Sequence, residues 1–470
     1  MNVLFRSVVL CACLMLGQGR TSQATPADTG RYVISDIIVL GNQRTRPAVI
    51  LRELTFSRGD TLTRDALAEQ VLISRNYLLN TGLFHEAKFS LVPQSGCSCL
   101  LIAVEVIERW YIIPVPALNL YDRNFNVWWV EHRRDLRWLQ YGIRFYYKNL
   151  TGNNDELRLT ALAGFQQNFS LLYQLPQLDE RRHHSLRVYV SFTRSKRLAY
   201  GLSENRELIY QDLNSYQRMH VSTNADYQWR PAFNHRYTVS AGYRRYTITD
   251  TVAALNPDYA GDSATLLHYP FVKIGYIRDF RDVIAYPLRG SYQELWLMRM
   301  GLGMKGQLNG WAAQATAAVY GSRGRWYGAA LARLRVSTPS DLPYLLQRSL
   351  GYSSDYVAGY EYYAINGTSF GYLKLSVKRP LLQWHLATNP TNILTRGARM
   401  PVFIYAKTFG ETGLAWQQPV EPGNALANHL LLGCGVGLDI VLFYDTSLRL
   451  DYALNRKGEH GLFVHYSTYF

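Results

Sequence analysis

Two clusters of basic, acidic and histidine side chains have the types and spacing that could do chemistry. His132-Arg-Arg-Asp135 places an imidazole near a carboxylate, as a general acid and base require, and Arg181-Arg-His-His184 offers two imidazoles to a metal ion. We expect no nucleophile elbow, and the chain has neither an H-E-x-x-H helix nor a P-loop. Both clusters fall at expected strand ends, where polar loop residues are usual. The chain is therefore predicted to be no enzyme and to bind no metal or cofactor.

The cysteines add no metal site. Cys11 and Cys13 belong to the N-terminal segment, and Cys97 and Cys99 are too close for an ordinary bridge and lack further zinc ligands. Two interpretations stay open. Cys97, Cys99 and Cys434 are small buried or loop thiols, or the first two form a strained pair.

Residues 1–24 have the pattern of a secretory signal peptide. Arg6 supplies positive charge, residues 7–17 form a short apolar run, and Ser22-Gln-Ala24 offers a small-residue cleavage site. The run is too short to cross a bilayer as a helix. We therefore expect the mature chain to begin after Ala24.

The elements that must position the remaining residues change in kind near residue 110. Residues 31–109 predict a compact α+β domain in the order β-α-α-β-β, in which Thr63 caps the second helix. From residue 110 to 470 the helical period disappears, and short alternating strands are divided by Gly, Asn, Asp and Pro. In residues 186–193, for example, Leu, Val, Val and Phe alternate with Arg, Tyr, Ser and Thr.

Composition favours a membrane barrel for the second part. Aromatic residues make up 13% of the chain, with 35 Tyr and 10 Trp, and no later run of about 18 apolar residues suggests a membrane helix. The net charge of +15 is spread along the strands, so nucleic-acid binding is not expected. We predict an all-β transmembrane barrel of about sixteen antiparallel strands, with apolar residues toward lipid and charges around a wet lumen. A soluble sandwich with the faces reversed is the alternative.

The C-terminal strand, residues 461–470, supports a barrel in a bacterial outer membrane. Its apolar and mixed faces alternate, and it ends on an aromatic residue, Phe470. A half-apolar edge strand invites aggregation in a soluble protein, whereas barrel closure removes the edge.

The 31–109 domain resembles a POTRA domain, the periplasmic unit of the BamA/TamA outer-membrane assembly superfamily. The resemblance rests on a "GN" turn, an "REL" segment, a "GD" turn and a "GLF" segment. The POTRA residues it picks out are Gly41, Asn42, Gly59, Asp60, Gly82 and Phe84.

The barrel segment is similar to the same superfamily at two places. A strand-turn-strand signature, "D-x-R-D … P-x-x-G", matches Asp279, Arg281, Asp282, Pro287, Arg289 and Gly290, and predicts a tight turn with charges paired in the lumen. A long connection, about 337–367, resembles the loop that folds back into the lumen and presents a V-R-G-F/Y tip. Here the tip is Val357, Ala358, Gly359 and Tyr360, so alanine replaces the arginine that would pair with wall carboxylates. Arg348 is a candidate substitute.

The resemblance implies a function without catalytic residues. The POTRA sheet edge would capture unfolded outer-membrane proteins by β-augmentation, and the barrel would insert them through a lateral gate between its first and last strands. We expect Pro114 and Pro116 to keep the first strand from pairing fully, and Gly461 and Phe470 to form the other side of the gate.

The expected partners follow from this function. They are outer-membrane lipids and lipopolysaccharide, unfolded outer-membrane proteins and accessory lipoproteins, with no nucleic acid. The alternative is a polypeptide secretion pore of the two-partner-secretion type.

Overall fold

The structure is a computed structural model, which describes residues 30–470 except 96–97, 121–124, 131–132, 137–138, 165, 177, 179–182, 304–307, 388–398, 443–445 and 469–470. The expected signal peptide, 1–24, lies outside the described residues. So do Cys97, His132, Arg181 and Phe470.

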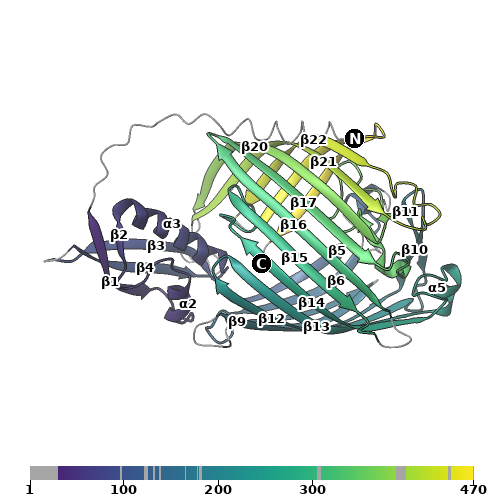
Figure 1. The fold of residues 1–470 in the computed structure, drawn as a ribbon, viewed down its shortest axis with the longest axis horizontal. Helices are drawn as coiled ribbons and strands as arrows, with labels where there is room; N and C mark the ends of the chain where they lie inside the picture. The colour runs from purple at the N-terminus through teal and green to yellow at the C-terminus, as the bar shows by residue number, and fades with distance from the viewer. Residues whose placement is uncertain are drawn as a thin grey trace.

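The N-terminal domain is a four-stranded sheet covered by two helices (Figure 1). Its sheet has the order β2-β1-β4-β3, built from β1 (Arg31–Leu40), β2 (Thr61–Thr63), β3 (Phe84–Pro93) and β4 (Cys99–Glu108). The helices are α2 (Pro47–Arg52) and α3 (Arg64–Asn80). Thr63 caps α3 as predicted, since its Oγ1 accepts a hydrogen bond from the Ala66 amide at 3.3 Å. The short strand β2 was not predicted, because three residues are too few to show an alternating pattern.

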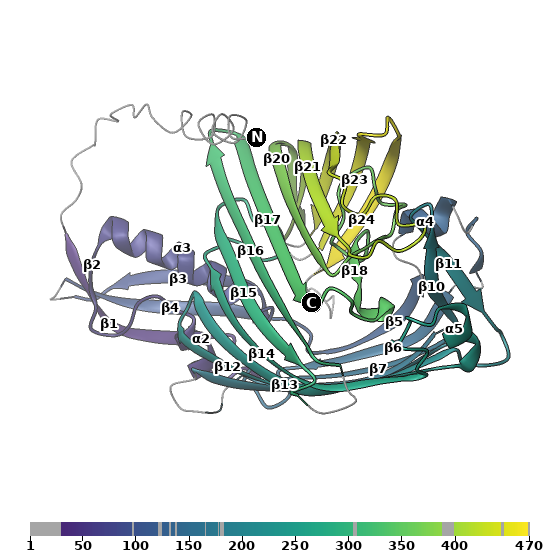
Figure 2. The ribbon, with the colours of Figure 1, turned by 45° about the vertical axis from the view of Figure 1, so that its right-hand side comes forward.

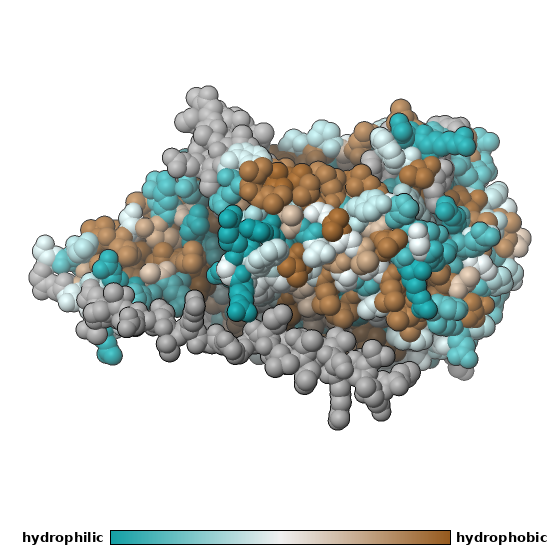
Figure 3. All heavy atoms as spheres, turned by 90° about the horizontal axis from the view of Figure 1, so that it is seen from above, coloured by the Kyte–Doolittle hydropathy of each residue, from teal (hydrophilic) through white to brown (hydrophobic). Residues whose placement is uncertain are grey.

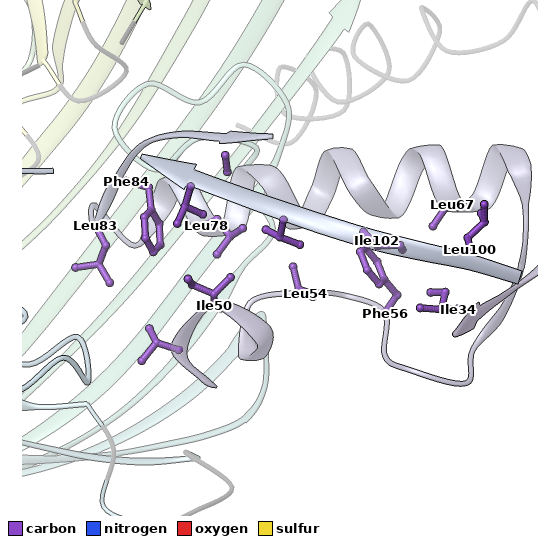
Figure 4. Packing of buried hydrophobic residues seen from close by; sticks show 14 of the residues in the cluster. Ile34, Ile50, Leu54, Phe56, Leu67, Leu78, Leu83, Phe84, Leu100 and Ile102 are labelled. Atoms are coloured by element: carbon purple, nitrogen blue, oxygen red, sulfur yellow. The ribbon is translucent and has the colours of Figure 1, made fainter. Parts of the chain in front are cut away.

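The core of this domain lies between the helices and the sheet (Figure 4). Helix α2 ends at Arg52. Leu54 and Phe56 leave the helix and fill the core instead, with 5% and 2% of their surfaces exposed. Burial of these two side chains therefore decides where α2 ends.

The rest of the chain forms one antiparallel sheet of sixteen strands in chain order, which confirms the predicted fold class (Figure 1). The strands are β5 (Ile112–Leu120), β6 (Leu139–Lys148), β7 (Glu156–Gly164), β8 (Gln166–Leu175), β9 (His184–Ser195), β12 (Arg218–Ala232), β13 (His235–Ile248), β14 (Leu266–Asp279), β15 (Gly290–Met300), β16 (Gly310–Arg323), β17 (Trp326–Thr338), β20 (Ser369–Ala387), β21 (Arg399–Trp416), β22 (Leu431–Leu442), β23 (Thr446–Asn455) and β24 (His460–Thr468).

The two faces of the large sheet differ as in a membrane-spanning barrel. Large apolar side chains such as Leu295 and Val319 are more than half exposed on the outside, whereas Asp439 and Asp451 are buried on the inside. Figure 3 shows hydrophobic residues over the outer surface of the barrel, with hydrophilic residues toward its ends. The charged face therefore surrounds the lumen, which argues against the soluble sandwich.

Smaller elements occupy the connections. They are α4 (Phe125–Val130), the hairpin β10 (Arg197–Ser203) and β11 (Arg206–Gln211), α5 (Asp250–Leu255), the 3-10 helix η3 (Tyr344–Leu346), β18 (Arg348–Leu350) and β19 (Ile365–Asn366). Among the described residues, no helix combines the length and apolar character needed to span a membrane.

Candidate functional site

The first and last strands of the large sheet each keep a free edge. Within the described residues, β5 pairs only with β6 and β24 pairs only with β23. Figure 2 shows the sheet curled with these two strands apart. We call the two free edges together the seam. An unpaired edge presents backbone donors and acceptors, which makes it a template for a further strand.

Hydrogen-bond alternation decides which residues of β24 face the seam. The Asn455 amide donates to the Glu459 carbonyl at 2.9 Å, so odd-numbered residues of β24 bond to β23. Gly461 is therefore paired inward with Ala453. The even-numbered positions from 460 to 468 present their N–H and C=O groups to the seam. None of them is proline, so this edge keeps every donor.

The same alternation gives β5 a different edge. The Lys148 amide donates to the Tyr111 carbonyl at 2.9 Å, so odd-numbered residues of β5 bond to β6. Pro114 and Pro116 are even-numbered, and all of β5 is paired with β6. The two prolines therefore leave the pairing with β6 complete and remove two donors from the seam, where the gate was expected. Their role in a gate stays a prediction.

Helix α4 covers part of the β24 edge. The Val464 amide donates to Asn126 Oδ1 at 3.0 Å, and Asn126 Nδ2 donates to the Val464 carbonyl at 3.4 Å. Asn126 is only 4% exposed. Sequence reasoning missed this residue, whose only signal is one amide within the apolar run Phe-Asn-Val-Trp-Trp-Val.

The tip of the long connection lies against the inner wall, close to β24. Val357, Ala358 and Tyr360 are all at most 4% exposed. A Cβ added at Gly433 would lie 1.9 Å from the Ala358 carbonyl oxygen, so only glycine admits the tip at this point of β22. The Asn455 side chain also donates to the Gly359 carbonyl at 2.8 Å. Backbone contacts therefore hold the tip.

The missing tip arginine is replaced in two ways. The Ala358 amide donates to Glu411 Oε2 at 2.9 Å, and Lys374 from the wall lies 3.3 Å from the same oxygen. An ion pair between the loop and the wall has its charges exchanged: the carboxylate, Asp355, is on the loop, and the arginine, Arg333, is on β17. A wall arginine and a loop carboxylate thus take the place of a loop arginine and a wall carboxylate.

Arg348, the candidate substitute, does not engage the wall carboxylates in the described contacts. Its guanidinium lies 5.3 Å from the centre of the Tyr352 ring, within the same connection.

Three loop side chains support β24 from inside the lumen. Tyr356 stacks on His465 with ring centres 4.8 Å apart, and Tyr362 contacts Phe463 at 5.4 Å. Glu361 Oε1 lies 3.6 Å from His465 Nε2. Burial raises the pKa of the Glu361 carboxyl from 4.5 to about 8, because desolvation penalises its charged form. The loop therefore holds the last strand mainly through rings and a carboxyl that favours its neutral form.

The signature residues lie in the connection between β14 and β15, at the POTRA end of the barrel. Arg281 makes a bidentate contact with Asp279 at 2.7 and 2.8 Å, and Arg236 adds a bond at 3.1 Å. Asp282 Oδ1 accepts the Leu288 amide at 3.0 Å. The connection spans 280–289, which is longer than the predicted tight turn because Asp282 closes a wider loop.

Two other signature residues shape the base of this connection. Gly290 has φ +101°, and an added Cβ would lie 1.9 Å from the Phe280 carbonyl oxygen, so glycine is required there. Arg289 donates to Ser322 Oγ at 2.9 Å. Pro287 is partly buried and lies two residues before Arg289 in the same connection.

This connection crosses the lumen from the POTRA end. The Tyr286 hydroxyl donates to Asp439 Oδ2 on β22 at 2.7 Å, and its ring packs on Tyr405 at 5.4 Å. Asp439 is neutralised by Lys407 at 2.8 Å and by Lys378 at 3.3 Å. Two cations and a hydroxyl thus offset the buried charge of Asp439 and join this connection to the inner wall at β22.

The opposite end is closed by buried amides. The turn of the β10–β11 hairpin reaches the long connection, where the Ala364 amide donates to the Asn205 carbonyl at 2.8 Å. Asn205 Nδ2 donates to Asn424 Oδ1 at 2.8 Å, and Asn424 Nδ2 donates to the Asn366 carbonyl at 2.9 Å. The lumen is thus occupied from both ends.

The POTRA residues form turns and one core position. Gly41, Gly59 and Gly82 all have positive φ, the conformation for which glycine is suited. Phe84 is fully buried in the core.

The remaining two fix local turns. Asn42 Nδ2 donates to the Thr45 carbonyl at 2.9 Å, and Asp60 Oδ2 accepts the Ser57 amide at 2.8 Å. The domain keeps one long open edge, since β3 pairs only with β4 among the described strands.

The turn after β1 fastens the N-terminal domain to the barrel next to β5. Arg44 Nη2 donates to the Tyr147 hydroxyl at 2.7 Å, and Thr45 Oγ1 bonds the Tyr111 hydroxyl at 2.8 Å. Asn149 Nδ2 also donates to Thr45 Oγ1 at 2.9 Å. Burial raises the pKa of the Tyr111 hydroxyl well above its usual range. The buried contacts of Thr45 with Tyr111 and Asn149 anchor the start of β5.

The residues first considered for chemistry do not form a catalytic or metal site in the described part of the chain. The Asp135 carbonyl accepts the Trp128 indole N–H at 3.1 Å, and His184 contacts the Tyr227 hydroxyl. The described residues contain no group of three or more His, Cys, Asp or Glu that could hold a metal. Cys99 is disulfide-bonded, whereas Cys434 is a free thiol exposed on the outer face.

One segment does have the spacing of a nucleophile elbow, contrary to expectation. Gly367-Thr-Ser369-Phe-Gly371 follows the G-x-S-x-G pattern, but Ser369 begins β20 and its Oγ accepts the Ser337 amide at 3.2 Å. A nucleophile elbow needs a turn from strand to helix, which this segment lacks.

Comparisons with known proteins agree with this architecture. The family model for POTRA, described as surface antigen variable number repeat, matches residues 32–95. No curated protein matches the chain.

Among solved structures, BamA from Haemophilus ducreyi lacking POTRA domains 1–3 is similar with a TM-score of 0.52 at 13% identity, over 93% of this chain and 85% of that chain. CdiB from Acinetobacter baumannii has a TM-score of 0.49 at 10% identity, over 93% of this chain and 73% of that one. CdiB from Escherichia coli has a TM-score of 0.48 at 12% identity, over 99% and 96%.

The class of protein follows from the fold. The described residues contain one POTRA domain followed by a sixteen-stranded barrel with the fold of BamA.

Proposed function

We propose that this chain is an outer-membrane assembly factor of the BamA/TamA type, which inserts client strands through the seam. The observation that carries the proposal is a β24 edge that pairs with no further described strand and keeps every backbone donor, on a barrel whose outer face is apolar. Backbone pairing tolerates any client sequence, as an assembly factor requires. The process needs no catalytic residue, metal or cofactor.

The filled lumen favours lateral insertion over a secretion pore. The loop tip enters from one end and Tyr286 from the other, and both are buried. A chain passing through the lumen would have to displace backbone contacts at Gly359 as well as the charged cluster around Asp439. A client strand that adds at the seam displaces neither.

Each part of the chain has a separate location and role in this function. Residues 1–24 direct export, residues 31–109 lie in the periplasm and residues 110–470 form the membrane barrel. The open β3 edge is suited to capture unfolded outer-membrane proteins, with accessory lipoproteins as further partners. Lipids and lipopolysaccharide surround the apolar band, and Phe470 serves recognition of the barrel itself.

Depletion of the protein tests the proposal in cells. Quantitative analysis of outer membranes should show selective loss of other barrels, and a plasmid-borne wild-type copy should restore them. Loss of one secreted protein with normal barrels would contradict insertion and would instead indicate two-partner secretion.

Reconstitution tests it directly. The purified chain in phospholipid vesicles should accelerate folding of a urea-unfolded eight-stranded outer-membrane barrel, read as heat-modifiable gel mobility. Equal folding in vesicles that contain an unrelated sixteen-stranded porin would overturn the proposal.

A further inference from the structure

We propose that clients add to the β24 edge and not to β5, and that Asn126 is a latch which occupies the receiving position until a client strand displaces it. The inference rests on the proposed function, because it names the edge that a client strand uses. It is carried by the two Asn126 hydrogen bonds and by the different seam-facing residues of the two strands.

The Asn126 carboxamide imitates a peptide group of a neighbouring strand. Its oxygen accepts from the Val464 amide at 3.0 Å while its nitrogen donates to the carbonyl of the same residue at 3.4 Å. A partner strand forms the same reciprocal pair in an antiparallel ladder. Val464 faces the seam by the register with β23, so the amide occupies a position that pairing would use.

The latch is short, which lets a strand replace it. Helix α4 has six residues, and Asn126 makes both of its described hydrogen bonds to Val464. A client strand would form that pair and add further bonds at Leu462 and Tyr466. Exchange therefore replaces the two Asn126 bonds with backbone bonds and adds further backbone bonds for the client.

The β5 edge cannot offer the same ladder. Pro114 and Pro116 occupy two successive seam-facing positions, so a strand added there would leave two of its carbonyls without donors. At the matching edge of β24 every seam-facing residue keeps its N–H. The seam is thus one-sided, and the client strand should register on β24.

Cysteine cross-linking tests which edge receives the client. Leu462 on β24 and Leu118 on β5 both occupy seam-facing positions and are 64% and 69% exposed, so they form a matched pair. Leu462→Cys and Leu118→Cys are made separately in a Cys434→Ser background, because Cys434 is a free, exposed thiol. The probe is the eight-stranded client with one cysteine in its terminal strand, added during vesicle folding. Disulfide formation at position 462 and little at 118 is expected; equal or stronger linkage at 118 overturns the choice of edge.

Variants at position 126 test the latch. Asn126→Ala should accelerate client addition about five- to thirtyfold, the range for one or two net hydrogen bonds. Val130→Ala, on an exposed face of the same helix, is the control and should leave the rate unchanged. An Asn126→Ala rate equal to wild type overturns the latch.

A reversible disulfide between α4 and β24 separates an effect on client addition from an effect on the folding of the variant itself. Asn126→Cys with Val464→Cys, in the Cys434→Ser background, should block client folding when oxidised and recover it with dithiothreitol. Full activity of the oxidised protein also overturns the latch.

The two proposals fail in distinguishable ways. If the wild-type chain does not accelerate client folding, the proposed function fails. If wild type is active but none of these variants differs from its control, only the present inference fails.

Discussion

The two edges of the seam belong to the same sheet but are treated differently by the chain. The β5 edge loses two donors to prolines, and the start of β5 is fastened to the POTRA domain through the contact between Tyr111 and Thr45. The β24 edge keeps all its donors and is held by contacts that can be broken, from α4 at its edge and the long loop on its inner face. A strand edge can thus be blocked by prolines that lack donors or covered by contacts with other elements, and only such contacts are reversible.

The largest effect should come from making the β24 edge like the β5 edge. Leu462→Pro removes a seam-facing donor but no bond to β23, so client folding in vesicles should fall about tenfold or more. Leu462→Ala removes the same side chain and keeps the donor, so it should stay near wild type. Pro116→Ala restores a donor on β5 and should change the rate little.

The reverse outcomes would contradict the proposed difference between the β24 and β5 edges. Tolerance of Leu462→Pro together with strong activation by Pro116→Ala would make β5 the receiving edge. Heat-modifiable mobility of each variant itself should be checked first, to show that its own barrel has folded.

A smaller effect on client folding is expected when only the docking of the long loop behind β24 is weakened. Gly433→Ala puts a methyl group 1.9 Å from the Ala358 carbonyl oxygen, and overpacking of this kind costs about 1–3 kcal/mol. Cleavage of residues 351–364 by added protease should increase, and so should cross-linking of the client at position 462. Gly410→Ala on β21 has no atom within 4 Å of the added Cβ and is the matched control. Equal protease resistance of both variants would show that the tip does not need the Gly433 contact.

The smallest effect should be a pH dependence of loop docking. Burial raises the pKa of Glu361 in the folded protein to about 8, so between its ordinary value of 4.5 and 8 the docked loop binds more protons than the released loop. This contribution to stability is complete below pH 4.5 and is lost as the pH rises to 8. The titratable groups around it are His465 on β24, Glu411 on β21 and Lys374 on β20.

Limited proteolysis of the loop between pH 5 and 9 checks this dependence. Wild type should become more sensitive as the pH rises, whereas Glu361→Gln, which stays neutral, should give a flatter profile. A Glu361→Gln profile as steep as that of wild type would assign the dependence to another group.

Much of the architecture could be predicted because it depends on local patterns. Period-two alternation with charges on one face predicted a membrane-type barrel, and Thr63 before an apolar helical pattern predicted the start of α3. The motifs that marked the tip, Val357 to Tyr360, also marked a segment that is buried in the lumen. The meaning of Ala358 could not be predicted, because its amide reaches Glu411 only after the loop has folded back across the barrel.

The sequence by itself determined that Pro114 and Pro116 lack donors, that the strands alternate and that a lone amide, Asn126, stands in an apolar run. Only the tertiary structure decided which edge those prolines affect, because the register of β5 with β6 selects the side to which each backbone group points. It also decided that Asn126 meets Val464, 338 residues away along the chain. The residue type determines whether a backbone position has an N–H donor, whereas strand pairing and folding determine the direction in which that N–H points.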